Sequence, residues 1–200
     1  MSNYAAGILP GLGTSSAYVL TRREDGETDH YQVLAARHGA PTLSYAEQAI
    51  AAAWLIEQQA PNAPWQINLD LTGTGQPVLE VFRTWLADRW TLRGWKLVED
   101  ESYERFARPP VVGTLHLLAR IVTLTQAGGL HLPHTPDGQR LYQAIGEIRP
   151  DTLFPAGEQG ALLVALGLAL CGGGGGPGML LLPELFEPEE PGLFERLRRR

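Results

Sequence analysis

The chain has 200 residues, of which 44% are apolar and 19% charged. This composition supports one sizeable core in one domain and excludes a fibrous or wholly disordered protein. Sixteen basic residues against 22 acidic ones give a formal net charge of −6, which argues against a basic nucleic-acid-binding surface spread over the protein and leaves room only for a local basic groove.

Neither cysteine content nor hydropathy indicates export or a membrane. Cys171 is the single cysteine, so an intramolecular disulfide is excluded and a reducing compartment is indicated. Residues 1–10 lack the pattern of a secretory signal. The most apolar run, residues 161–171, is shorter than the about 20 residues that a membrane-spanning helix needs. We therefore expect a cytoplasmic protein that makes no contact with a membrane.

The first part of the chain predicts three antiparallel strands and a helix. Residues 7–20 have the pattern of a strand, a glycine turn and a second strand, and residues 25–27 that of a polar hairpin tip. Residues 30–37 alternate as a third strand. Ser44, with Glu47 three residues later, predicts the N-cap of a helix that ends near Gln59.

The second part predicts alternating strands and helices. Residues 65–70 alternate as a strand that ends in an acid, and a glycine turn leads into a helix over about 78–90. A strand over 94–98, a helix over 111–126, a short strand over 130–132 and a helix over 135–148 follow. The almost wholly apolar residues 158–170 predict a buried helix.

The composition changes abruptly at Gly172, where five consecutive glycines begin. We expect one domain over residues 1–171, and a flexible linker with a tail rich in Pro, Glu and Arg over residues 172–200. The leucine and phenylalanine side chains of this tail could instead dock on a partner or on the domain itself.

The order of these elements resembles the RNase H-like nuclease fold, an α/β fold in which a three-stranded antiparallel meander is followed by parallel strands, flanked by helices. More narrowly, residues 70–80 (Asp-Leu-Thr-Gly-Thr-Gly-Gln-Pro-Val-Leu-Glu) are similar to the Asp-Ala-Thr-Gly-Val-Gly-Arg-Pro-Val-Val-Asp stretch of phage large terminase nuclease domains. Residues 7–11 resemble that family's Gly-Ile-Asp-Pro-Gly, and residues 159–169 its His-Asp-Asp-Leu-Val-Leu-Ala-Leu-Ala-Leu-Ala.

The resemblance implies a site for two divalent metal ions, held by carboxylates on the first strand, the fourth strand and the last helix. In this sequence the first-strand position is Leu9 and the last-helix positions are Gly160 and Ala161, so only Asp70 is kept. One carboxylate cannot hold a metal pair. We therefore expect a catalytically degenerate domain without a metal or other cofactor. We expect it to bind a protein partner, or to serve as a structural module, in phage DNA packaging or virion assembly. The phosphate loop of the family's ATPase motor is absent from the sequence.

Two other functions stay open. Asp70, Glu80 and Glu158 could form a rearranged carboxylate site of an active DNA endonuclease that uses Mg²⁺ or Mn²⁺; otherwise Asp70 caps the following turn and Glu80 complements a helix dipole. A DNA-binding domain without chemistry would need a basic groove. Its arginines would be Arg83, Arg89, Arg93, Arg105 and Arg108.

Three further patterns are weak indications of function. Residues 11–17 resemble the phosphate loop of the galactokinase and mevalonate kinase group, but residues 18–20 favour a strand, which indicates a simple turn. His131 and His134, three residues apart, and His116 are weak metal candidates. The five tryptophans favour packing within the core over a base-stacking surface.

Overall fold

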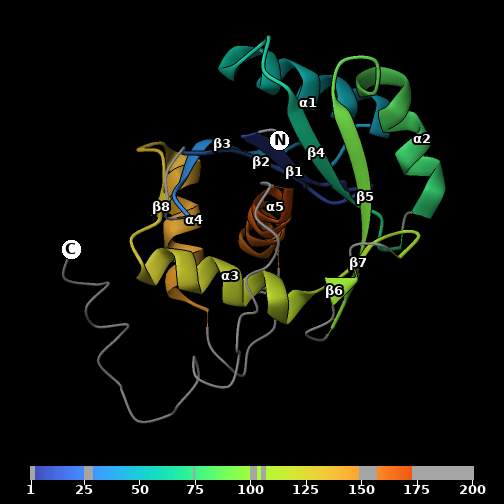
Figure 1. The fold of residues 1–200 in the computed structure, drawn as a ribbon. Helices are drawn as coiled ribbons and strands as arrows, with labels where there is room; N and C mark the ends of the chain where they lie inside the picture. Colours follow the sequence, from blue (N-terminus) through green and yellow to red (C-terminus); the bar gives the residue numbers. More distant parts are fainter. Residues whose placement is uncertain are drawn as a thin grey trace.

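The computed structural model describes residues 3–24, 29–73, 75–99, 103–104, 107–148 and 157–172. In this part of the chain the strands form one mixed sheet with the order β6-β7-β5-β4-β1-β2-β3-β8 (Figure 1). The strand bounds are Tyr4–Leu9 for β1, Ser16–Arg23 for β2, Tyr31–Gly39 for β3, Trp65–Asp70 for β4, Thr91–Val98 for β5, Tyr103–Glu104 for β6, Val111–Gly113 for β7 and Leu130–His131 for β8.

The order of strand directions, an antiparallel meander followed by parallel strands, is the one predicted from the sequence. β1, β2 and β3 form an antiparallel meander. β4 then lies parallel to β1 on its other side, and β5 lies parallel to β4. The parallel register places Ile8 beside Leu69, so the carboxyl ends of β1 and β4 meet at the same edge of the sheet. The predicted α/β class, with a meander followed by parallel strands, is confirmed.

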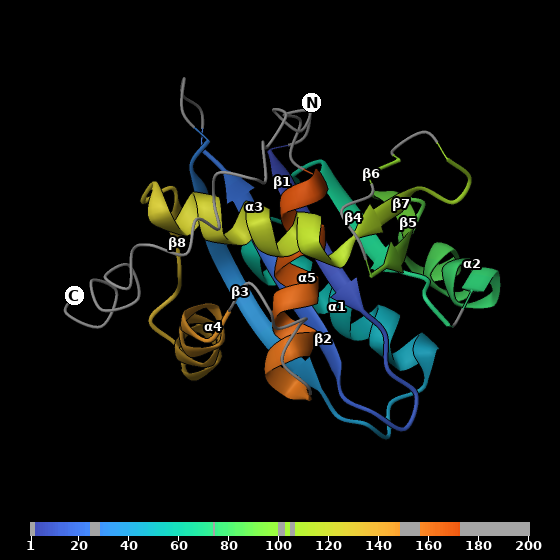
Figure 2. The same ribbon diagram turned by 90° about the horizontal axis from the view of Figure 1, so that it is seen from below.

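The helices cover both faces of the sheet. α1 (Tyr45–Gln59) and α2 (Gly75–Leu86) lie on one face, and α5 (Glu158–Gly172) lies on the other along β1 and β2 (Figure 1). α3 (Thr114–Gln126) crosses α5 on the side away from the sheet, and α4 (Pro136–Gly146) lies beside α5 (Figure 2). Among the described helices, none has the length and apolar character needed to cross a membrane.

The core is divided by the sheet, as the period-2 alternation of strands requires. Ile8 and Leu69 belong to the cluster under α1 and α2. Leu9 packs instead against the clusters around α5. Almost all of the α5 side chains are buried. Of the tryptophans, Trp65, Trp90 and Trp95 are buried. The packing prediction is wrong for Trp54 and Trp85, which lie on the outer surfaces of α1 and α2 with 58% and 51% of their area exposed.

The sequence predicted the start of α1 correctly but misplaced the ends of other helices and strands. Ser44 caps α1 as predicted, because its side chain accepts from the Glu47 amide while the Glu47 carboxylate accepts from the Ser44 amide. The helix expected from residue 111 begins at Thr114, because Val111 and Val112 pair with β5 as a strand. The helix expected over 78–90 runs from Gly75 to Leu86, and β5 begins at Thr91 rather than at residue 94.

Two predicted segments lie outside the described residues. These are the hairpin tip at residues 25–27, and the tail beyond Gly172, where α5 ends. The glycine-rich residues 11–17 connect β1 to β2, and a strand, not a helix, follows them as expected. The buried Gln48 side chain accepts from the Gly11 amide (3.2 Å) and donates to the Gly11 carbonyl. The side-chain amide of Gln48 therefore holds this turn in place.

Candidate functional site

The strand ends at the centre of the sheet lie beneath α5, and a glycine sets how closely this helix approaches. A Cβ at Gly7 of β1 would lie 1.8 Å from the Ala165 carbonyl oxygen and 2.6 Å from the Ala169 amide nitrogen. On β4, Asn68 donates to the Leu168 carbonyl (3.0 Å) and accepts from the Trp95 indole (2.9 Å). These contacts hold the middle and second half of α5 against β1 and β4.

Asp70 is the acid at this junction. It ends β4 on the face that Asn68 turns toward α5, and its side chain is buried. Its carboxylate accepts from the Thr72 amide at 2.8 Å. Burial raises the pKa of Asp70 above its usual value, and the hydrogen bonds from Thr72 offset only part of this effect. The Thr72 hydroxyl in turn accepts from the Leu97 amide (2.8 Å), so the carboxylate belongs to a turn that is bound to β5. Asp70 thus makes the hydrogen bond expected of a turn cap.

The positions beside Asp70 carry no acid. Leu9 follows Ile8, the partner of Leu69, so the register brings residue 9 next to Asp70, one strand spacing of about 4.8 Å away. Its side chain packs against the same apolar cluster as Ala161 on the first turn of α5. Gly160, in that turn, is buried and offers no side chain. The three positions that the resemblance assigns to metal-binding acids are therefore occupied by apolar residues in contact with the core.

The structure does not bring Asp70, Glu80 and Glu158 together. Glu80 lies on α2, across the sheet from α5, where its exposed carboxylate accepts from Arg83 (2.6 Å) and Gln76 (2.5 Å). The Glu158 carboxylate accepts from the Ser15 hydroxyl at 3.3 Å, next to β2. Two strand spacings of about 4.8 Å separate β2 from β4.

The backbone of Glu158 is also held away from β4. Its carbonyl accepts from the His38 Nε2 atom of β3 at 2.7 Å. Among the described residues, no group of metal-ligand side chains includes any of these three acids. Their separation gives no support to a shared metal site.

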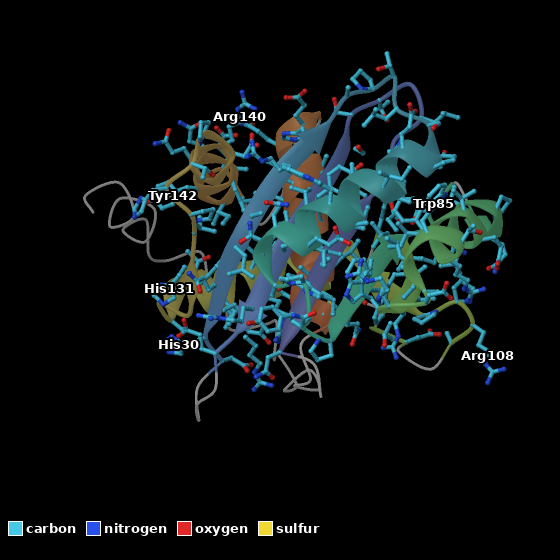
Figure 3. All side chains as sticks on the ribbon, turned by 90° about the horizontal axis from the view of Figure 1, so that it is seen from above. His30, Trp85, Arg108, His131, Arg140 and Tyr142 are labelled. Atoms are coloured by element: carbon cyan, nitrogen blue, oxygen red, sulfur yellow. The ribbon has the colours of Figure 1, made fainter. Side chains whose placement is uncertain are left out.

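The candidate arginines are largely occupied by neighbours. Arg83 pairs with Glu80 at 2.6 Å, and Arg89 pairs with Glu57 while its guanidinium lies over Trp90. Arg93 lies over the Trp95 ring, 5.8 Å from its centroid. Arg108 is exposed, at the opposite side of the molecule from His131 (Figure 3). Arg105 lies outside the described residues. This distribution gives no support to a continuous basic groove.

The candidate histidines lie in different surroundings. His116 is buried in α3, and burial together with the nearby Arg120 charge lowers its pKa. His134 is exposed in the segment before α4. His131 lies beside Glu24 and His30, and these three form a group of potential metal ligands. No sequence pattern indicates Glu24 or His30 as partners of His131, because only the pairing of β8 with β3 brings them together.

Comparisons with solved structures identify the fold. The large terminase of a thermophilic bacteriophage matches 73% of this chain with a TM-score of 0.51 and 8% identity, and the chain covers 32% of that protein, about a third of its length. The human cytomegalovirus terminase nuclease domain, soaked with Mn, matches 83% of this chain and 80% of its own length, with a TM-score of 0.51 and 14% identity. Thermus thermophilus RuvC matches 84% of this chain and 90% of its own length, with a TM-score of 0.41 and 14% identity.

The two terminase likenesses show that this chain has the RNase H-like fold of terminase nuclease domains, as the sequence resemblance predicted. Comparison with protein-family models and with curated protein sequences gives no match.

Proposed function

We propose that this protein is a catalytically degenerate domain of the terminase-nuclease type that acts as a binding or structural module. The observation that carries this proposal is the junction of β1, β4 and α5. There Leu9 lies beside Asp70, Gly160 and Ala161 supply no carboxylate, and the Asp70 carboxylate is committed to the Thr72 amide.

The chemistry of metal-dependent phosphodiester cleavage needs more than this junction offers. Two divalent ions about 4 Å apart require several anionic oxygens, together with room for the attacking and leaving oxygens. A single buried carboxylate whose pKa is raised by burial holds its proton more readily than an exposed one, which weakens it further as a ligand. The residues present therefore do not fit a pair of Mg²⁺ or Mn²⁺ ions.

The role we assign to the domain is to bind a protein partner in phage DNA packaging or virion assembly. This binding takes place in the cytoplasm or in the phage particle. The fold likeness to terminases supports a role in phage DNA packaging or virion assembly. Two exposed tryptophans support the binding of a protein partner. Trp54 of α1 and Trp85 of α2 leave large aromatic surfaces uncovered on two adjacent helices, and Figure 3 shows Trp85 on α2, on the face of the molecule that α1 and α2 cover. Aromatic side chains are enriched in protein–protein interfaces.

A plasmid-cleavage assay tests the proposal. The full chain is incubated with supercoiled DNA in Mg²⁺ or Mn²⁺, with Asp70→Ala as the matched control. We expect no nicking above that of the control in either metal. Cleavage that Asp70→Ala abolishes would show an active nuclease with a rearranged site. Cleavage that persists equally in the variant would indicate a contaminating enzyme, and the assay would be repeated on further purified protein.

A further inference from the structure

Three potential metal ligands meet at the edge of the sheet where β8 pairs with β3. Glu24 follows β2, His30 precedes β3 and His131 lies in β8. One ligand atom from each lies within 4.8 Å of the other two. The two imidazole rings are stacked, with their centroids 6.0 Å apart and their planes inclined by 25°, and Figure 3 shows them side by side.

The backbone fixes this arrangement. The Glu24 amide donates to the His30 carbonyl at 2.9 Å, which closes the end of the β2–β3 hairpin. The Tyr31 amide donates to the Gly129 carbonyl at 2.7 Å, which places β8 beside β3. A Cβ at Gly129 would lie 2.5 Å from the Asp29 carbonyl oxygen, so only glycine allows the two segments to approach this closely. The convergence of the three side chains therefore follows from strand pairing.

Among the described residues, no other contact uses the ligand atoms. Asp29, the neighbouring carboxylate, pairs with Arg23 (2.8 Å) and Arg120 (3.7 Å). In the part of the chain that the structure describes, no cation pairs with the Glu24 carboxylate and no hydrogen bond engages a ring nitrogen of His30 or His131. Glu24 and His131 are exposed and His30 is half-buried, so an ion can reach them from solvent.

We propose that Glu24, His30 and His131 bind one divalent transition-metal ion of the zinc class. Two imidazoles and a carboxylate are a ligand set that suits Zn²⁺ and its neighbours, whereas Mg²⁺ and Ca²⁺ prefer oxygen ligands alone. Tetrahedral zinc with ligand distances of about 2.0–2.1 Å needs ligand atoms about 3.3 Å apart. The three ligand atoms already lie within 4.8 Å of one another, and rotation of the exposed Glu24 and His131 side chains brings them to this separation.

Three protein ligands leave a fourth position open to water or to a donor from another molecule. The bound ion links the end of the β2–β3 hairpin to the short edge strand β8. It lies at the end of the sheet where β1 begins, and β1, β2 and β3 separate β8 from β4, so the site is separate from the Asp70 junction. The proposal is independent of the function proposed above.

Calorimetric titration of the untagged full chain with ZnCl₂ tests this site. The variants are Glu24→Gln, His30→Ala and His131→Ala, and the matched control is His134→Ala, which removes an exposed histidine three residues from His131 and outside the group. Circular dichroism of each variant verifies that it folds. Thermal unfolding with ZnCl₂ or with EDTA supplies a second readout.

We expect one zinc ion per chain for the wild type and for His134→Ala. Saturable binding is lost in His30→Ala and His131→Ala and weakened at least tenfold in Glu24→Gln. Zinc at 100 times its Kd shifts the folding equilibrium about 100-fold, which corresponds to a rise in Tm of roughly 5–10 °C. MgCl₂ at the same concentration leaves Tm unchanged. Equal zinc binding by all the folded variants, or no saturable binding by the wild type at micromolar zinc, would overturn the proposal.

Discussion

Leu9→Asp places an acid at the position that the resemblance assigns to a metal ligand. The loss in the free energy of unfolding that this substitution causes can be worked out from the structure. Replacing a half-buried leucine loses about 1 kcal/mol of apolar burial. The new carboxylate lies one strand from Asp70, and two like charges about 5 Å apart repel by about 3 kcal/mol at an effective dielectric constant of about 20. We expect Leu9→Asp to lower the free energy of unfolding by about 4 kcal/mol at neutral pH without metal.

Leu9→Asn is the matched control, because it loses the same apolar contact but adds no charge. It should cost about 1 kcal/mol, so the difference between the two variants measures the repulsion from Asp70. Urea unfolding in EDTA gives both values, and a thermal-unfolding series with MnCl₂ follows. Manganese should raise the Tm of Leu9→Asp alone, since a cation between two carboxylates relieves their repulsion. Equal stability of the two variants and no response to manganese would refute the placement of residue 9 beside Asp70.

Two further predictions test the packing and the electrostatics of the junction. Gly7→Ala should lower the free energy of unfolding in urea by at least about 3 kcal/mol, because its Cβ would meet the backbone of α5 at 1.8 Å. In the control Gly146→Ala no atom lies within 4 Å of the added Cβ, so its free energy of unfolding should stay within about 0.5 kcal/mol of the wild type. Equal effects of the two substitutions would contradict the close approach of α5. Burial raises the pKa of Asp70 in the folded state, so the folded protein holds the carboxyl proton more tightly than the unfolded chain does. The contribution of Asp70 to the free energy of unfolding therefore falls as pH rises from about 4 through the folded pKa. Asp70→Asn keeps a hydrogen-bond acceptor but does not titrate, so it should gain stability relative to the wild type over that range; a difference in unfolding free energy that stays constant with pH would count against the burial effect.

The elements that local patterns specify were predictable from the sequence. Alternation predicted the meander and the strand that ends at Asp70, and the Ser44–Glu47 spacing predicted the start of α1. The start of α3 was not predictable, because whether Val111 joins a helix or a strand depends on the presence of β5 beside it. Short strands such as β6 and β8 likewise depend on partners that are distant in the sequence.

The same limit applies to the sites. The loss of acids at Leu9, Gly160 and Ala161 could be inferred only through a resemblance, since no local pattern marks a missing ligand. For His131, sequence spacing suggests His134 as the neighbour, whereas the β3–β8 register places it beside His30, about 100 residues away along the chain. A group assembled by strand pairing leaves no signal in the spacing of its members.

Manganese binding at the Asp70 junction distinguishes a degenerate junction from one that still holds a metal ion. The full chain carrying His30→Ala and His131→Ala, which removes the proposed zinc site, is titrated with MnCl₂ while the electron paramagnetic resonance signal of free Mn²⁺ is followed. Adding Asp70→Ala gives the control. We expect both proteins to leave the same concentration of free manganese. Stoichiometric loss of the free signal that Asp70→Ala abolishes would contradict it, and would show that the junction still holds a metal ion.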